Sequence, residues 1–176
     1  MAIVLCPGVH PPEVSESFRT RFTPLHRYQY HFIPKTIAPY DGPAIAQYLH
    51  IHSPPTASLV IMGFSAGAVG ALYAARELHD QGSAIAALWL WDGWGVPLLG
   101  LPFPTVRISH DAFTDWSSAL LGGGDYRFWA EPAVAHLDLW REPERVWGWR
   151  SQGLGLRERM SLLEFATDRL AVSCID

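Results

Sequence analysis

The sequence predicts an α/β fold: a three-layer α/β/α sandwich around a mainly parallel sheet of about five strands. Short apolar runs alternate with helical segments along the chain, which is the pattern of βαβ units. Some runs, such as "AIVLC" and "AIAALWLW", are apolar throughout, as expected for strands buried on both faces. Hydrophobic residues make up 49% of the 176 residues and charged residues 17%, so we expect one globular domain spanning residues 1–176.

The first part of the chain contains three predicted strands and two predicted helices. In order, these are a strand at 2–6, a helix that opens at Pro12, a strand at 27–33, a helix over 41–52 and a strand at 57–64. Pro12 and Pro43 suit a first helical turn, because the fixed φ of proline matches the helix and its missing N–H costs no bond there. Asp41 is a candidate N-cap for the second helix.

The second part begins with the strongest predicted helix, over 66–82, which ends at the C-cap candidate Gly82. The elements predicted after it are strands at 84–91 and 105–109, and helical segments near 116–121, 138–149 and 156–170. With right-handed crossovers, the strands are expected in the spatial order 2-1-3-4-5.

Composition argues against several classes of protein. The formal net charge is −4 and the basic residues are scattered, which disfavours a nucleic-acid partner. No apolar segment approaches the roughly 20 residues of a membrane helix, and the N-terminal run lacks the basic region of a signal peptide. The two cysteines, Cys6 and Cys174, do not suggest a disulfide framework, so we expect a cytoplasmic protein.

Gly63-Phe64-Ser65-Ala66-Gly67 is a G-x-S-x-G motif that lies between a predicted strand and a predicted helix. A strand that reverses sharply into a helix strains the backbone at the serine, and bulky side chains two residues away on either side would clash. The helix N-terminus also points its positive dipole end and free N–H groups toward Ser65, which favours negative charge developing there. The alternative is a glycine-bounded turn with an incidental serine.

On this motif the chain resembles the α/β-hydrolase superfamily, whose members carry a nucleophile, an acid and a histidine in that order. The resemblance implies a minimal, lid-less version of that fold and a serine hydrolase of esterase or thioesterase type. It implies that Ser65 attacks the carbonyl carbon of an ester or thioester and that water then hydrolyses the acyl-enzyme. It implies no cofactor and no metal.

Three histidines follow the serine: His79, His110 and His136. His79 lies too far along the predicted helix to meet Ser65, and His110 directly follows a strand. His136 comes late in the chain and precedes a helical segment, as the superfamily pattern requires. The stretch "AHLDLWREPERVW" is also similar to the region around the histidine of small hydrolases of this superfamily. We therefore expect His136 to be the general base, with a surface or core histidine as the alternative.

The acid is expected to follow the strand at 105–109. Asp111 comes directly off the end of that strand and is preferred, and Asp115 is the alternative. Ser109-His110 replaces the small residue usual before the acid in the superfamily, which leaves the choice between these two aspartates open. Asp92, after the preceding strand, is a third option, its other roles being a cap, a loop residue or a residue of the cleft.

Two backbone N–H groups are expected to form an oxyanion hole. One belongs to Ala66, and the other to Val9, with His10 as second choice, in a "CPGVH" loop that resembles the superfamily's His-Gly-x loop. The segment 92–104 is too short for a helical cap, so the cleft is expected to be shallow and open. The residues expected to contact the substrate or wall this cleft are His10, Phe64, Trp94, Leu98, Leu99 and Trp129.

The expected substrate is a small-molecule ester or acyl compound, with acyl length, ester or thioester chemistry and the oligomeric state left open. The rival hypothesis is a non-catalytic binding protein that uses a Trp-rich cleft on the same scaffold. A flavodoxin-like cofactor binder is disfavoured, because no G-x-G-x-x-G follows the first strand. His50 and His52 do not converge in a helix and predict no metal site.

Overall fold

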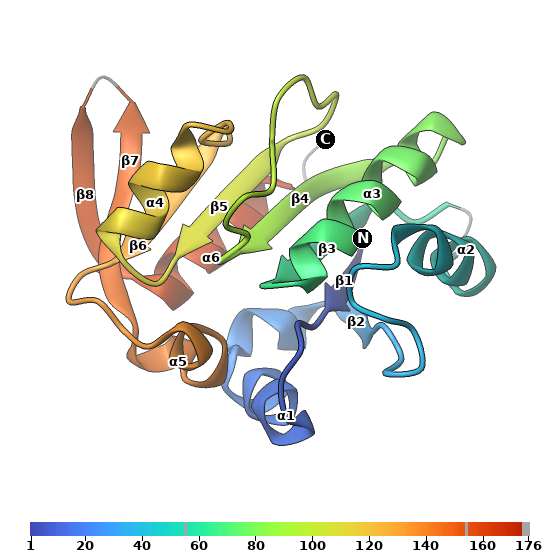
Figure 1. Cartoon of the computed structure of the whole chain (residues 1–176), viewed down its shortest axis with the longest axis horizontal. Coiled ribbons are helices and arrows are strands. Elements are labelled where there is room, and N and C mark those ends of the chain that lie inside the picture. Colours follow the sequence, from blue (N-terminus) through green and yellow to red (C-terminus); the bar gives the residue numbers. More distant parts are fainter. Residues whose placement is uncertain (55, 154, 174–176) are drawn as a thin grey trace.

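A computed structural model of the chain shows one continuous sheet between two layers of helices (Figure 1). The structure describes residues 1–54, 56–153 and 155–173. The strands are β1 (Ala2–Cys6), β2 (Gln29–Phe32), β3 (Leu59–Phe64), β4 (Ile85–Trp91), β5 (Thr105–Ser109), β6 (Tyr126–Ala130), β7 (Trp147–Gly153) and β8 (Leu156–Ser161). They form an eight-stranded sheet in the order β2-β1-β3-β4-β5-β6-β7-β8. Pairing is parallel from β2 to β6 and antiparallel between β6, β7 and β8.

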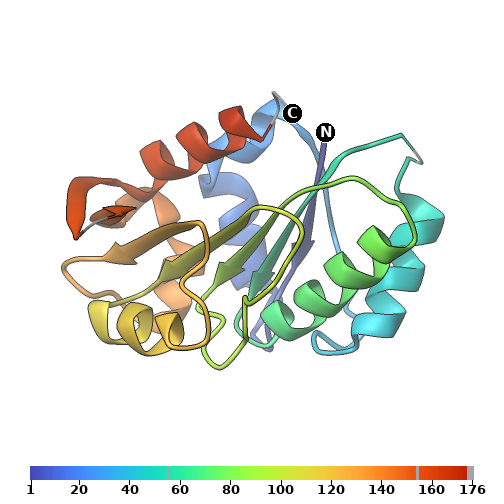
Figure 2. The ribbon, with the colours of Figure 1, turned by 90° about the horizontal axis from the view of Figure 1, so that it is seen from above.

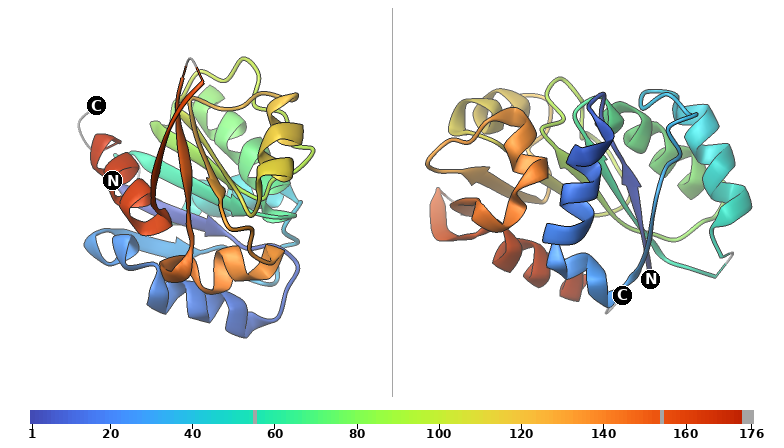
Figure 3. Two further views of the ribbon diagram at one scale, coloured as in Figure 1. Left: turned by 90° about the vertical axis from the view of Figure 1, so that its left-hand side faces the viewer. Right: turned by 90° about the horizontal axis from the view of Figure 1, so that it is seen from below.

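Helices cover both faces of the sheet. They are α1 (Pro12–Arg21), α2 (Gly42–His52), α3 (Gly67–Asp80), α4 (Ala112–Ala119), α5 (His136–Arg141) and α6 (Leu162–Val172), with short 3₁₀ turns η1 (Thr23–Arg27) and η2 (Pro143–Arg145). Seen from above and from the side, α1, α5 and α6 lie on one face, and α2, α3 and α4 lie on the other (Figures 2 and 3). The predicted α/β fold with helices on both sides of a mostly parallel sheet is thus confirmed.

Each face of the sheet has its own hydrophobic core, because successive residues of a buried strand point to opposite sides. In β1, Ile3 and Leu5 pack into the core that also contains Phe18 of α1 and Trp140 of α5. Val4 packs into the opposite core, with residues of α2 and α3. Because both faces of β1 are covered, its sequence is apolar without interruption.

The sheet is larger than the five strands that the sequence predicts. The order 2-1-3-4-5 is correct for the first five strands, but β6, β7 and β8 extend the sheet beyond β5. The helix expected over 138–149 ends at Arg141 and is followed by β7, and the segment 156–170 divides into β8 and α6. The strand β8 is exposed along most of its length at the edge of the sheet, so its alternating charges resemble those of a solvated helix.

None of the helices in the described part of the chain is long and apolar enough to cross a membrane. Cys6 is a free, buried thiol at the end of β1, and burial raises the pKa of this thiol to about 12. Cys174 lies outside the described residues.

The strand order reverses between β1 and β3, which are neighbours in the sheet. The chain leaves β1 toward α1 on one face and leaves β3 toward α3 on the other (Figure 2). In open α/β sheets, ligands bind beyond the carboxyl ends of the strands at such a reversal. The residues that follow β1, β3, β4 and β5 meet at this edge.

Candidate active site

Ser65 occupies the turn between β3 and α3, in a backbone conformation that serine rarely adopts. Its φ is 52°, in the left-handed region. The Ser65 N–H donates to the carbonyl oxygen of Trp91 at 2.9 Å, and the Ser65 carbonyl accepts from the N–H of Ala68 at 3.0 Å. These bonds fix the strained residue between β4 and α3. The strand-turn-helix context that the G-x-S-x-G motif needs is therefore present.

The glycines around Ser65 permit close backbone approach. A Cβ on Gly67 would lie 2.1 Å from the carbonyl oxygen of Cys6, and one on Gly63 would lie 2.6 Å from the Cα of Ala68. A Cβ on Gly8 would lie 2.9 Å from the Cβ of Ser65. Without these glycines, the loop after β1, the end of β3 and the start of α3 could not converge on the serine.

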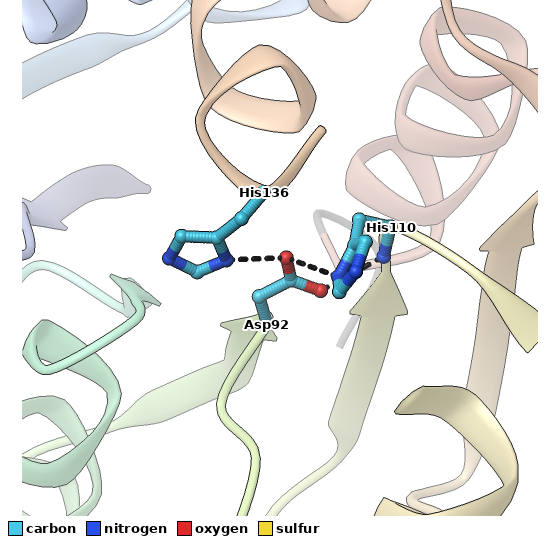
Figure 4. Close-up of side chains that lie close together, drawn as sticks. All are labelled: Asp92, His110 and His136. Atoms are coloured by element: carbon cyan, nitrogen blue, oxygen red, sulfur yellow. Dashed lines mark hydrogen bonds and ion pairs between the residues drawn. The ribbon is translucent and has the colours of Figure 1, made fainter. Parts of the chain in front are cut away.

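Asp92 follows β4 and carries the central carboxylate of the site. Its φ is 49°, so Ser65 and Asp92 are the two non-glycine residues with positive φ in the described ranges. The side chain is only 2% exposed, and its Oδ1 accepts from the backbone N–H of His110 at 2.8 Å. Its Oδ2 lies 2.8 Å from the Nδ1 of His136 and 2.8 Å from the Nδ1 of His110 (Figure 4).

His136 is the first residue of α5, and its ring is held by a hydrogen bond and by an aromatic stacking contact. Its Nδ1 donates to the buried carboxylate of Asp92. Its ring stacks on that of Phe64, with centroids 4.9 Å apart, and Phe64 in turn stacks on Trp140 at 5.1 Å. With Nδ1 donating, the neutral ring carries its lone pair on Nε2, which is the tautomer of a general base. Phe64 is fully buried and serves as a wall for His136.

The aspartate that contacts His136 in the structure is not Asp111, the one that the sequence favours. Asp111 caps α4, where its Oδ1 accepts from the N–H of Thr114 at 2.6 Å. Asp115 is buried and ion-paired with Arg127 at 2.7 Å, and burial raises the pKa of its carboxyl. In the structure, Asp111 and Asp115 thus contact groups other than the Nδ1 of His136, where the sequence predicts one of them.

Asp92, the third option, lies beside the histidine instead. Because α4 begins directly after β5, Asp111 is used as its cap. The turn after β4, by contrast, directs Asp92 across the neighbouring strand end toward α5 (Figure 4). A signal was present in the sequence: Asp92 directly follows an apolar strand and precedes a glycine.

Within the described ranges, Ser65 Oγ makes no hydrogen bond, to His136 or to any other residue. The serine and the histidine are linked through Phe64, which precedes Ser65 and stacks on His136. In the same part of the chain, the N–H groups of Val9 and Ala66 donate no backbone hydrogen bond, so both are free to meet an oxyanion.

A cavity of about 860 Å³ opens beside the loop after β1, between α1 and the segment that joins β2 to α2. Its apolar walls include Val9, Ile33, Ile37, Pro39 and Ile45, and its charged residues are Glu13, Glu16, Arg19 and Lys35. His10, which the sequence predicts to contact the substrate, is among the residues that line this cavity.

This cavity does not lie beside the tryptophans and leucines that were expected to wall the cleft. Trp94, Leu98, Leu99 and Trp129 are not among the residues that line the cavity. Trp94 is 69% exposed on the loop after β4. Trp129 lies opposite Trp149 in the β6–β7 pair. The cavity forms at the β1–β2 side of the sheet because the chain between β2 and α2 leaves a gap over α1.

Arg107 of β5 supports the loop that carries Asp92, a role that the sequence analysis missed. The side chain is 1% exposed, and its guanidinium donates to the carbonyl oxygens of Gly93 at 3.1 Å, Val96 at 2.9 Å and Gly122 at 2.9 Å. Burial lowers the pKa of Arg107 to about 10, so the group remains charged at neutral pH. An arginine at the centre of the predicted strand "TVRIS", between Val106 and Ile108, is the signal that marks it.

Asp92, His110 and His136 also form a group of possible metal ligands. One ligand atom from each residue lies within 4.8 Å of the others. Both imidazoles already contact the carboxylate, so a cation would have to displace these contacts.

Comparison with protein-family models and with curated protein sequences finds no match to this chain. Function is therefore inferred from the residues and their geometry.

Proposed function

We propose that this protein is a serine hydrolase, built like a small member of the α/β-hydrolase superfamily, that cleaves a carboxylic ester or thioester. One observation carries the proposal: the buried carboxylate of Asp92 holds the Nδ1 of His136 at 2.8 Å, while the ring of His136 stacks on the residue next to Ser65. A strained serine, an oriented histidine and a buried acid are the parts that acyl transfer needs.

In the proposed mechanism, Nε2 of His136 takes the proton of Ser65 Oγ as the serine attacks the carbonyl carbon. Asp92 keeps His136 in the required tautomer and stabilises the imidazolium that forms. His136 then gives its proton to the leaving alcohol or thiol, and water hydrolyses the acyl-enzyme with His136 again as base. The Ser65–His136 hydrogen bond is expected to form when substrate binds, since such bonds tighten in the substrate complex.

The developing oxyanion would be bound by the backbone N–H groups of Ala66 and Val9. Ala66 precedes the first residue of α3, where the helix dipole favours negative charge. The contact of Gly67 with the Cys6 carbonyl brings the loop of Val9 toward this helix end. In this proposal the two donors come from different loops, one after β1 and one after β3.

The cavity beside this loop is proposed to hold the acyl part of the substrate. Its volume of about 860 Å³ falls in the range of roughly 300–1,000 Å³ that is typical of small-molecule sites. The apolar walls suit a hydrocarbon chain, and Gly8, one of the lining residues, lies next to Ser65. A medium-length acyl ester therefore fits better than a short acetyl ester.

Active-site labelling tests the proposal directly. A fluorophosphonate probe is expected to label the wild-type protein and Ser83→Ala, a control at an ordinary loop serine, but not Ser65→Ala. A panel of p-nitrophenyl and CoA esters of increasing chain length then identifies the acyl group. Labelling that persists in Ser65→Ala would overturn the assignment of the nucleophile.

A binding role on the same scaffold is the second candidate function, and the surface of α4 favours it. This helix buries Thr114, Asp115 and Ser118 while it exposes Phe113 and Trp116. An exposed aromatic surface of this kind is typical of contact sites. A folded protein that no fluorophosphonate labels would support this candidate over the hydrolase.

A further inference from the structure

We infer that Trp140 is a positioning residue: its ring sets where the imidazole of His136 stands in the candidate active site. The effect of Trp140 on catalysis rests on the proposed hydrolase function. Its effect on the ring of His136 does not, because that follows from the packing of aromatic side chains around α5. Trp140 lies one turn after His136 on the same helix and is fully buried.

A hydrogen bond alone does not fix the imidazole of His136. The contact with Asp92 holds one ring atom, Nδ1, and leaves the plane of the ring free to turn about that contact. The direction of Nε2 depends on this plane, and Nε2 is the atom that takes the proton in the proposed mechanism. The ring of Phe64, with its centroid 4.9 Å away and its plane inclined by 22°, fixes the plane. The position of His136 is therefore only as well defined as that of Phe64.

Trp140 contacts the residues that directly precede Ser65 and Asp92 in the chain. Its indole stacks on Phe64, with centroids 5.1 Å apart and planes 10° apart, and meets the ring of Trp91 edge-on at 5.3 Å and 85°. The backbone joins these two strand ends as well, since the carbonyl of Trp91 accepts from the N–H of Ser65 at 2.9 Å. One side chain of α5 thus touches the ends of both strands, β3 and β4, that are followed by the serine and the aspartate.

Helix α1, which lies beside α5 (Figure 1), supports Trp140 from another element. Phe18 stacks on the indole, with centroids 3.6 Å apart and planes 6° apart. The hydroxyl of Ser17 donates to the carbonyl oxygen of Arg141 at 2.7 Å. Helix α5 has only six residues and no side-chain cap at its start, so its place depends on such packing rather than on intrinsic helix stability.

The indole of Trp140 is used for its ring and not for its N–H group. In the part of the chain that the structure describes, Nε1 of Trp140 is buried without a hydrogen-bond partner, although a buried tryptophan usually finds one. Phenylalanine at this position therefore keeps a flat ring and removes an unpaired donor, whereas leucine removes the ring. The two variants separate the stacking contact from the filling of space alone.

The test compares the esterase kinetics of Trp140→Leu, Trp140→Phe and Trp89→Leu. Trp89 is the matched control, because it is equally buried in the same core, but its ring contacts Phe165 of α6. We expect Trp140→Leu to lower kcat on a p-nitrophenyl ester by about 10²-fold, as misplacement of a reacting group by about 1 Å can do. KM is expected to stay within a few-fold, because Trp140 does not line the cavity. The other two variants are expected to keep kcat within a few-fold.

NMR reads the position of His136 without any substrate. In the wild type, the stacked ring of Phe64 is expected to shift the ring-proton signals of His136 upfield and to give cross-peaks between the two rings. At the same fixed pH, these signals are expected to move toward those of an exposed histidine in Trp140→Leu, and to stay in place in Trp140→Phe and Trp89→Leu. A merely structural role would destabilise both leucine variants alike and leave the His136 signals unchanged.

Either of two results would overturn the inference: unchanged His136 signals in folded Trp140→Leu, or a loss of kcat in Trp89→Leu equal to that in Trp140→Leu. If Trp140→Leu does not fold, Phe18→Leu decides, because it removes the support of the indole and leaves the indole itself. Displacement of the His136 signals in the same direction by a smaller amount then supports the inference, and unchanged signals overturn it.

The NMR arm separates this inference from the proposed function. Displaced His136 signals in Trp140→Leu, in a protein that hydrolyses no ester, would support the positioning role and remove the hydrolase. Ester hydrolysis that depends on Ser65, with kcat and the His136 signals unchanged in Trp140→Leu, would do the opposite.

Discussion

Ser65 and Asp92 end two adjacent parallel strands, and each adopts a positive φ without being glycine. Such positions cost on the order of 1–3 kcal/mol each and persist only where the surrounding structure fixes them. The strain has a use here, because it places one hydroxyl and one carboxylate at the same edge of the sheet. Asp111 has no such strain, since its extended backbone and capping bond are those of an ordinary helix start.

Exchanging the two acids for their amides separates their roles. Asp92→Asn is expected to lower kcat on a p-nitrophenyl ester by on the order of 10³–10⁴-fold, because the amide no longer stabilises the imidazolium or enforces the tautomer of His136. Asp111→Asn keeps its cap and is expected to retain kcat at neutral pH within a few-fold. Equal losses in the two variants would contradict the assignment of Asp92.

The protonation of His110 also has a consequence for stability. Its folded pKa lies above the unfolded value of about 6.5. Its contribution to stability is therefore fully present below about pH 6.5 and is lost as the pH rises through the folded pKa. Urea unfolding across pH 5–9 is expected to show this loss in the wild type and not in His110→Gln. Parallel pH profiles for the two proteins would contradict it.

At the scale of elements, the strands that lie inside the parallel sheet are those that the sequence predicts. Strands β1, β3 and β4 are apolar on both faces because helices cover them on both sides, so their consecutive residues are nearly all apolar. Strand β5 is equally buried but carries Arg107. The strands β7 and β8 have no such runs: they pair locally with each other, and β7 joins the rest of the sheet at β6. Ser65 and His136 are predicted from local patterns, whereas the aspartate that contacts His136 depends on the backbone turn after β4.

Arg107 connects these elements, and its removal tests how much the site depends on them. Arg107→Met leaves three loop carbonyls without their buried donor, so we expect the free energy of unfolding to fall by about 3 kcal/mol or more. Activity is expected to fall as well, because Gly93 is next to Asp92. Arg76→Met is the control: Arg76 donates to Leu99 of the same loop, but from an exposed position. Urea unfolding in which the two variants lose equal stability would contradict this role.

At the scale of the whole molecule, the sheet has two open edges of different character. The strand β2 ends the parallel side, and the exposed strand β8 ends the antiparallel side. Arg157 and Arg159 lie opposite Ser151 and Trp149 in the β7–β8 pair, and Glu158 forms an ion pair with Arg150. Charges along an exposed edge oppose its pairing with another sheet.

Replacing Arg157 and Arg159 together by valine removes this protection. We expect the variant to associate as its concentration rises, which light scattering coupled to size-exclusion chromatography measures. Replacement of both by lysine is the control, and it is expected to leave the mass of the particle as in the wild type. A valine variant that keeps the wild-type mass at every concentration would show that these charges do not protect the edge.

The lining of the cavity comes entirely from residues 6–45, whereas the serine, the carboxylate and the histidine come from residues 65–136. In the proposed hydrolase, acyl recognition and the three reacting side chains therefore come from two separate, contiguous stretches of the chain, and the first stretch also supplies the Val9 N–H. A library that randomises only Ile33, Ile37 and Ile45 would diversify the acyl preference while every reacting group stays in its native surroundings. Under the same proposal, side chains of the first stretch could change in evolution toward new acyl groups while Ser65, Asp92 and His136 keep their surroundings.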